Sequence, residues 1–230
     1  MLALLHTSPV HVPVFDALRD EDHPDLELRH TVDEELLTRA RIAGPAAVAG
    51  EVRAALGRAV ADGADAVLCT CSTIGGVAER AKAGVPVLRV DRPMAAAAVA
   101  IGPRVTVVAA LESTLAPTVA LVEDEARAAG RPTVTVRTLS ADGAWARFEA
   151  GDRHGFAAAV AATADSVTGA DVIVLAQASM APAQRLVTTA IPVLSSPRPG
   201  LAAGADAARR ARTQPVRAQN QPVRIPRATG

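Results

Sequence analysis

Two halves of this chain repeat one another, and this repeat restricts the available folds more than any other feature. The segment TVVAALESTLAPTVALVEDE at 106–125 aligns with LALLHTSPVHVPVFDALRDE at 2–21, an offset of 104 residues. ADVIVLAQASM at 170–180 aligns with ADAVLCTCSTI at 64–74, and IPVLSSPRP at 191–199 aligns with VPVLRVDRP at 85–93, both at an offset of 106. The three pairs of segments occur in the same order and at nearly the same offset, which predicts a duplicated unit. The alternative is that unrelated βα units share this pattern.

Strand and helix patterns alternate in this chain, which is typical of parallel sheets covered by helices. We therefore predict an α/β fold of two flavodoxin-like lobes related by a pseudo-twofold axis, with a ligand cleft between them. The lobes are expected at 1–100 and 101–198, with 199–212 packing back on the first. Apolar runs predict strands at 2–5, 26–29, 66–70 and 85–90, and helices are expected at 13–19, 45–61, 77–83 and 200–212.

Charge and cysteine content exclude several classes of protein. The chain of 230 residues carries 24 basic and 24 acidic side chains, so nucleic-acid binding is not predicted. No uncharged apolar run has membrane-spanning length, and no secretory signal is visible. Cys69 and Cys71 are the two cysteines, and their spacing on one strand suits neither a disulfide nor a zinc site. We expect a reduced, cytoplasmic protein without a membrane partner.

The end of the chain differs from the rest in composition. From residue 204 onward six arginines face one acid, Asp206, and QPVR occurs at 214 and again at 221. Polar, proline-bearing sequence without apolar periodicity predicts a disordered basic tail at 213–230. Such a tail either stays solvated or contacts an acidic partner.

Cys71 is the strongest candidate for a catalytic residue. It ends an apolar strand and precedes Ser72, Thr73 and a Gly-Gly pair. Backbone N–H groups and the helix dipole favour a thiolate at such a position, which is also where open α/β sheets bind ligands. The alternative is an inert buried thiol, and this alternative is favoured for Cys69, which lies deeper in the strand.

The repeat places Gln177 across the cleft from Cys71. A glutamine amide does not titrate, but it can donate a hydrogen bond to a carboxylate or enolate oxygen. A glutamine with no assigned task is the other interpretation. Ser72, Thr73 and Ser179, the repeat mate of Thr73, either bind a substrate carboxylate or cap helices.

The residues after the first strand of each half are further candidates. His6, Thr7 and Ser8 are expected to reach the cleft and contact substrate, with His6 facing Cys71 unless it is structural. Glu112 occupies the repeat position of Ser8. It is the best carboxylate candidate for a second base, although a first-turn glutamate also suits the helix dipole alone.

Two other features admit two interpretations each. Arg92 and Arg198 are repeat mates that either bind an anion or form the hinge between the lobes. The stretch 145–156 contains the only tryptophan and is either a lid over the cleft or a surface loop.

The LLHTSP start, the strand ending CTCST, the mirrored strand ending LAQASMA and the late IPVLSSP resemble the cofactor-independent aspartate/glutamate racemase superfamily. This group includes hydantoin racemases, maleate isomerase and arylmalonate decarboxylase, and the resemblance covers roughly residues 2–200. It implies a cysteine on each side of the cleft, one removing a proton next to a carboxylate or carbonyl and the other returning one. It implies no metal, nucleotide or pyridoxal phosphate, and a homodimer is one option for assembly.

Cys71 matches the first cysteine of that superfamily, whereas Gln177 stands at the place of the second. The resemblance therefore implies an isomerase of the racemase type acting on a small carboxylate or amino-acid-like substrate. Because paired thiols are absent, a single-thiol lyase, such as a decarboxylase, and a non-catalytic carboxylate-binding protein remain alternatives.

Overall fold

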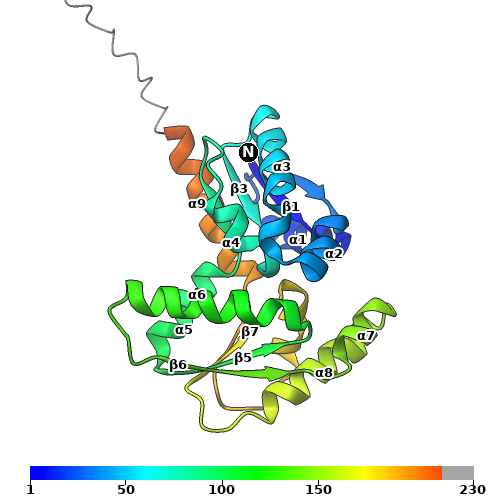
Figure 1. Ribbon diagram of the computed structural model, residues 1–230, viewed down its shortest axis with the longest axis vertical. Helices are drawn as coiled ribbons and strands as arrows, with labels where there is room; N and C mark the ends of the chain where they lie inside the picture. The colour runs from blue at the N-terminus through cyan, green and yellow to red at the C-terminus, as the bar shows by residue number, and fades with distance from the viewer. Residues whose placement is uncertain (214–230) are drawn as a thin grey trace, which may run out of the picture.

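The computed structural model describes residues 1–213, which form two lobes built on separate four-stranded parallel sheets (Figure 1). The strand orders are β2-β1-β3-β4 and β6-β5-β7-β8, so the sheets share one topology. The predicted α/β fold with two similar lobes is confirmed. The strands are β1 (Leu2–His6), β2 (Leu28–Val32), β3 (Ala66–Cys69), β4 (Val87–Arg89), β5 (Arg104–Ala109), β6 (Thr135–Ser140), β7 (Val172–Leu175) and β8 (Val193–Leu194).

Helices cover both faces of each sheet. The α-helices are α1 (Val12–Asp22), α2 (Glu34–Ala43), α3 (Ala49–Ala61), α4 (Ser72–Arg80), α5 (Arg92–Ile101), α6 (Leu115–Ala128), α7 (Ala144–Glu149), α8 (Arg153–Asp165) and α9 (Pro197–Thr213). Short 3-10 segments are η1 (Pro9–His11), η2 (Pro45–Val48), η3 (Glu112–Thr114) and η4 (Ala178–Arg185). None of the helices within 1–213 combines the length and apolar character needed to cross a membrane. The tail predicted beyond Thr213 lies outside the described residues.

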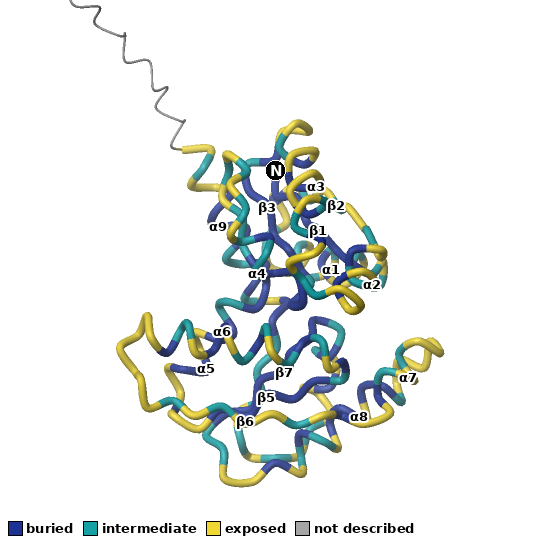
Figure 2. Tube along the Cα trace, in the orientation of Figure 1, coloured by how far each residue is buried: buried dark blue, intermediate teal, exposed yellow. Residues whose placement is uncertain are grey.

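The central strand β1 is buried on both faces, and its residues alternate between two cores. Ala3 and Leu5 belong to a core with helices α2 to α4, whereas Leu2 and Leu4 pack with α1 and α9. The edge strand β2 is half exposed, as Figure 2 shows, and its polar sequence LRHTV carries little apolar signal. The predicted range 26–29 was therefore displaced by two residues toward the amino end.

Helix α4 begins at Ser72, five residues before the predicted start, and Cys71 is its N-cap residue. The predicted helix at 77–83 began after Gly75 and Gly76, but both glycines lie inside α4. A Cβ atom at Gly75 would lie 3.1 Å from Cβ of Arg89 in β4, so the glycine permits close packing of this helix on the sheet. The whole first turn of α4 therefore follows directly on the end of β3.

The final helix of each half crosses to the other lobe. Met94, Ala95, Ala98 and Val99 of α5 pack in the core of the second lobe, so the predicted boundary at residue 100 was too late. Conversely, α9 packs on β1 and β3 of the first lobe. A Cβ atom at Gly204 in α9 would lie 2.9 Å from Cδ2 of Leu2, which shows how closely this helix approaches the sheet.

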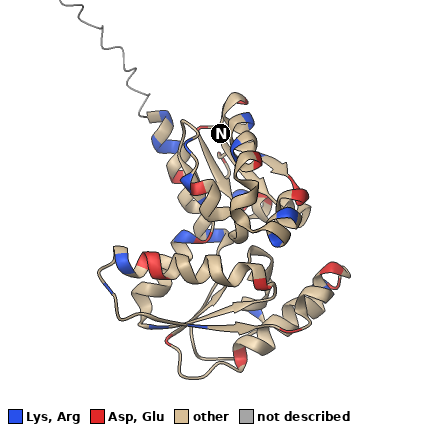
Figure 3. Ribbon diagram, in the orientation of Figure 1, with Lys and Arg blue, Asp and Glu red and all other residues tan. Residues whose placement is uncertain are grey.

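Arg92 and Arg198 both form ion pairs with acidic side chains of neighbouring helices, but only the pairs of Arg92 link the two lobes. Arg92 of α5 binds Glu79 of α4 at 2.6 Å and also Asp124 and Glu125 of α6. Its repeat mate Arg198 binds Glu21 and Asp22 at the end of α1. Figure 3 shows basic and acidic residues interspersed over both lobes, with basic residues also at the junction between them. Because carboxylates already occupy both guanidinium groups, these contacts argue against anion binding, and the contact of Arg92 with Glu79 favours the hinge interpretation for Arg92.

Candidate active site

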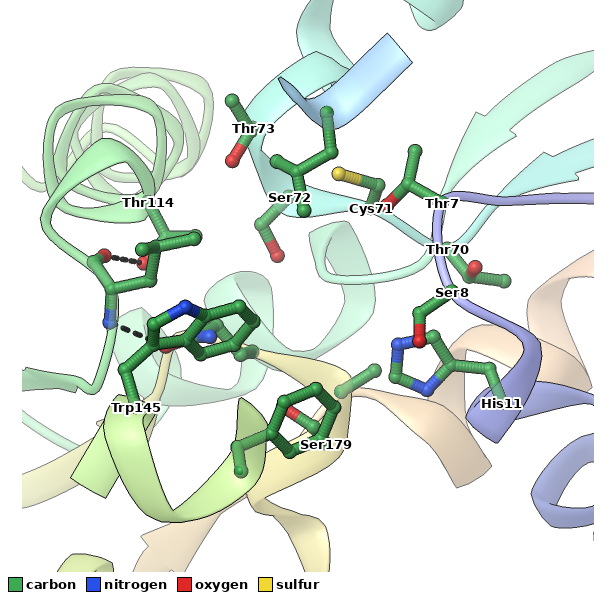
Figure 4. Close-up of a pocket in the computed structure, with 15 residues that line it drawn as sticks. Thr7, Ser8, His11, Thr70, Cys71, Ser72, Thr73, Thr114, Trp145 and Ser179 are labelled. Atoms are coloured by element: carbon green, nitrogen blue, oxygen red, sulfur yellow. Dashed lines mark hydrogen bonds between the residues drawn. The ribbon is translucent and has the colours of Figure 1, made fainter. Parts of the chain in front are cut away.

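A pocket lies between the lobes, where the carboxyl ends of β1, β3, β5 and β7 meet (Figure 4). The enclosed volume is about 40 Å³, which is room for about three water molecules. A ligand larger than this requires movement of the lining side chains or of the lobes. The lining residues are Thr7, Ser8, His11, Leu37, Thr70, Cys71, Ser72, Thr73, Leu111, Thr114, Trp145, Phe148, Gln177, Ala178 and Ser179.

Cys71 lies in this pocket at the amino end of α4 and is half-buried. Burial raises the pKa of its thiol, because the charged form loses its hydration. Hydrogen-bond donors oppose this effect: the hydroxyl groups of Thr7 and Thr73, and the backbone N–H groups of Thr73 and Ile74. The thiol is therefore protonated at neutral pH, and its surroundings are arranged to receive negative charge if a thiolate forms.

Gln177, the N-cap residue of η4, occupies the corresponding position in the second lobe. Its Oε1 atom accepts hydrogen bonds from the backbone N–H groups of Ala110 at 2.8 Å and Leu111 at 3.0 Å. Two N–H donors can meet only the amide oxygen, so the orientation of this side chain is fixed. The NH₂ group of Gln177 is the end that remains to donate into the pocket that this residue lines.

Ser72 connects the two lobes at the base of the pocket. Its hydroxyl donates to the carbonyl oxygen of Ala176, at the end of β7, over 2.7 Å. The side chain is 4% exposed, and its proton is committed to this contact. Ser72 was predicted to contact substrate. The structure adds a second role, because the side chain holds the two lobes together.

Aromatic residues of α7 form the outer wall of the pocket. Trp145 stacks on Phe148 with ring centroids 4.8 Å apart, and Phe148 contacts Phe156 edge-on at 5.2 Å. The guanidinium of Arg41, from α2 of the first lobe, lies 5.9 Å from the centroid of Trp145. The aromatic wall therefore reaches the opposite lobe, as the lid interpretation of this stretch requires.

His11 is a titratable lining residue that sequence reasoning missed. It ends η1, three residues after Ser8. Burial and the neighbouring charge of Arg153 lower its pKa to about 4. The imidazole is therefore neutral at pH 7 and has a nitrogen lone pair available to accept a proton.

Seven of the predicted site residues line the pocket, but His6 and Glu112 do not. His6 is fully buried, because alternation along β1 directs it to the face of Leu2 and Leu4, against Phe15 of α1. Alternation was readable in the sequence and would have excluded His6 as a residue facing Cys71. Glu112 begins η3 and is exposed. The predicted members that the structure brings together are Thr7, Ser8, Cys71, Ser72, Thr73, Gln177 and Ser179.

The other lining residues had weaker sequence signals. Leu37 belongs to α2, a helix that was not predicted, and Leu111 and Thr114 follow β5. Trp145 and Phe148 were noted as a lid or a loop. Within residues 1–213, no group of three or more histidine, cysteine or acidic side chains is placed to hold a metal ion.

Solved structures with the same two-lobed fold include several racemases. Aspartate racemase from Picrophilus torridus gives a TM-score of 0.66 at 13% identity, covering 90% of this chain and 93% of that chain. Allantoin racemase from Pseudomonas fluorescens gives 0.51 at 18% identity, covering 100% and 99%. A double mutant of arylmalonate decarboxylase in its liganded form gives 0.54 at 18% identity, covering 90% and 92%. At these identities the likeness concerns the fold alone.

A search of curated protein sequences returns no match to this chain. The family model described as Asp/Glu/Hydantoin racemase, in contrast, matches residues 11–208, which include most of both lobes and all of the pocket residues except Thr7 and Ser8. The chain therefore belongs to the Asp/Glu/hydantoin racemase family.

Proposed function

We propose that this protein is an isomerase of the racemase type, in which Cys71 transfers a proton at a carbon next to a carboxylate or carbonyl of a small acid. The observation that carries the proposal is the place of Cys71: its thiol lines the inter-lobe pocket at the amino end of α4, directly across from Gln177 of the second lobe. Thr7 and Thr73 lie beside it in the same pocket and oppose the effect of burial on its pKa. Cys69 illustrates the contrast, since it is fully buried and its Sγ lies 3.8 Å from the carbonyl oxygen of Cys71.

A substrate carboxylate or enolate needs donors opposite the thiol. The NH₂ group of Gln177 and the hydroxyl of Ser179 supply them from the second lobe, and the hydroxyl of Ser8 from the first. Donors that point at the developing enolate oxygen stabilise it more than they stabilise the substrate, and this difference lowers the barrier to proton transfer. Gln177 therefore acts as an oxyanion donor in this proposal, not as an acid or base.

Isomerisation needs a second proton carrier besides Cys71. Among the described residues that line the pocket, His11 is the other titratable side chain, and its lowered pKa keeps the imidazole neutral and able to accept a proton at pH 7. We assign the second transfer to His11, which accepts the proton when the thiol donates and returns it in the reverse reaction. This assignment replaces Glu112, which lies outside the pocket.

A lyase is the second candidate function, and the raised pKa of Cys71 favours it. A decarboxylase generates an enolate by losing carbon dioxide and then needs one acid on one face. A protonated thiol beside a non-titrating amide fits that requirement without any second carrier. The two candidates differ in one residue, because only the isomerase depends on His11.

The test is incubation of the protein in D₂O with aspartate, glutamate, allantoin and phenylmalonate, followed by NMR and by measurement of carbon dioxide release. An isomerase incorporates deuterium at the stereogenic carbon of one compound, whereas a lyase releases carbon dioxide. Cys71→Ser is expected to lower turnover by about 10²–10⁴-fold, the usual contribution of a general acid–base group. Cys69→Ala is the matched control, since it removes the other thiol without touching the pocket.

His11→Gln separates the two candidates: turnover lost together with unchanged melting supports the isomerase, and turnover retained supports the lyase. Full activity of Cys71→Ser would refute both. Thermal stabilisation by a compound that is never converted would instead identify a binding protein.

A further inference from the structure

Four side chains outside the described chemistry form a continuous chain of hydrogen bonds from the pocket to the surface. Thr70 lines the pocket, and its Oγ1 lies 2.7 Å from Nδ1 of His6. Nε2 of His6 lies 2.8 Å from Nδ1 of His30, and Nε2 of His30 lies 3.2 Å from Oδ1 of Asp16. The side chain of Asp16 is 40% exposed, whereas His6 is fully buried. The fold thus connects the wall beside Cys71 to solvent through two imidazole rings.

The donors and acceptors of this chain fit one direction throughout. The carboxylate of Asp16 can only accept, so Nε2 of His30 carries a proton. With both rings neutral, Nδ1 of His30 accepts from Nε2–H of His6, and Nδ1 of His6 accepts from the hydroxyl of Thr70 over 2.7 Å. The carbonyl oxygen of Leu5 competes for the same hydroxyl proton at 3.2 Å, but it also accepts from the backbone N–H of Thr70 at 3.0 Å. The shorter contact is the one to His6, and Leu5 keeps a donor when the hydroxyl proton moves to the imidazole.

Each member comes from a different element of the first lobe. His6 ends β1, His30 lies in the neighbouring β2, Asp16 lies on α1 and Thr70 follows β3. The groups that face His6 are His30, stacked at 5.1 Å between centroids, His11 at 6.1 Å and Phe15 at 5.6 Å. The guanidinium of Arg19 lies 3.5 Å from Oδ1 of Asp16. The side chain of Asp16 is the partly exposed member of the four, so this end is where a proton passes to water.

We propose that Thr70, His6, His30 and Asp16 form a proton relay that exchanges protons between the pocket and solvent. The proposal rests on the proposed function insofar as a proton must enter or leave the pocket during turnover. The relay gives the pocket a path that does not depend on water entering beneath the aromatic wall.

Each proton moves one hydrogen bond along the relay. The hydroxyl oxygen of Thr70 takes a proton from the pocket as its own proton passes to Nδ1 of His6. The Nε2 proton of His6 moves to Nδ1 of His30, and the Nε2 proton of His30 moves to the carboxylate of Asp16, which releases it to water. Both rings end neutral with their protons on Nδ1, so the chain is then set to carry the next proton inward.

The test uses the full chain with ¹⁵N-labelled histidine and D₂O as the probe. In the wild type, NMR is expected to show His6 and His30 neutral at pH 7 with the proton of each ring on Nε2. Asp16→Asn is expected to slow exchange of the His6 ring proton by about an order of magnitude, because a buried group exchanges only through an opening or a path. Asp20→Asn is the matched control: Asp20 lies on the same helix and binds Arg19 at 2.6 Å, but it does not contact His30. Equal exchange rates in the two variants would overturn the relay, as would a charged ring at pH 7.

Thr70→Val tests the pocket end of the relay. It leaves the path from His6 to Asp16 intact, so exchange of the His6 proton is expected to stay at the wild-type rate. Turnover of the active compound from the D₂O panel is expected to fall by about 10²-fold, the low end of the range for proton-transfer groups. Wild-type turnover in Thr70→Val would overturn the connection to the pocket. If no compound of the panel reacts, the proposed function fails, while the exchange measurements still decide whether the relay conducts.

Discussion

Mild acid is expected to destabilise this protein through His6, before the carboxylates titrate. His6 is fully buried, and burial, followed by the charges of His11 and His30, lowers its pKa from 6.5 to about 3. A group whose pKa is lowered by folding contributes stability above its unfolded pKa and loses it as pH falls toward the folded value. From pH 7 to pH 5 only the unfolded chain takes up this proton, which lowers the free energy of unfolding by about 2 kcal/mol, since one pKa unit is worth about 1.4 kcal/mol.

Urea unfolding at pH 7 and pH 5 measures this loss. The pH 5 limit matters because Asp and Glu side chains titrate at about pH 4 and would add their own losses below it. The free energy of unfolding falls between pH 7 and pH 5, and His6→Gln is expected to make this fall smaller by about 2 kcal/mol. This expectation holds whatever the stability of the variant at pH 7. His154→Gln, at an exposed histidine of α8, is the matched control and should keep the wild-type difference. A His6→Gln protein with the full wild-type loss would refute a neutral, buried His6.

Three further substitutions test the pocket. Gln177→Glu keeps an acceptor for the N–H groups of Ala110 and Leu111 but replaces the donating NH₂ with charge, so calorimetry should show carboxylate binding weakened by about tenfold or more; unchanged affinity would contradict the proposed oxyanion role. Ser72→Ala removes the bond to Ala176 and should cost about 1 kcal/mol in urea unfolding, whereas wild-type stability would show that this contact does not hold the lobes. Trp145→Ala removes the stacked ring and should speed alkylation of Cys71 by iodoacetamide; an unchanged rate would show that the aromatic wall does not limit access.

The buried strands were predictable because burial on both faces requires an uninterrupted apolar run. The segments around β1, β3, β5 and β7 have such runs, and their repetition indicated two lobes with one topology. Edge strands and surface helices are harder to predict, because fewer of their residues are apolar. Helix α2 has two fully buried residues, Leu36 and Ala40, and it was not predicted. The return of 199–212 to the first lobe was predicted, and α9 packs there, but the crossing of α5 to the second lobe depends on tertiary packing that no local pattern encodes.

The pocket was predicted as far as it consists of residues that follow strands. Thr7, Cys71 and Gln177 follow central strands of their sheets, and carboxyl ends of parallel strands meet at one edge. Trp145 and Leu37 reach the pocket from helices whose placement depends on how the lobes face one another. Nothing in the sequence pattern indicated that His11 lines the pocket, apart from its short distance along the chain from Ser8. His6 was misassigned because its position at a strand end outweighed the alternation that directs it away.

The return of α9 to the first lobe has a consequence for how the chain is made. Leu2, Leu4 and Leu68 pack against Leu201, Ala205 and Ala208, which follow the whole second lobe in the chain. A nascent chain that ends after the first lobe's own strands leaves these leucines without their cover. The core of the first lobe is therefore completed only after the second lobe has been synthesised, so the first lobe cannot finish folding ahead of the second during synthesis.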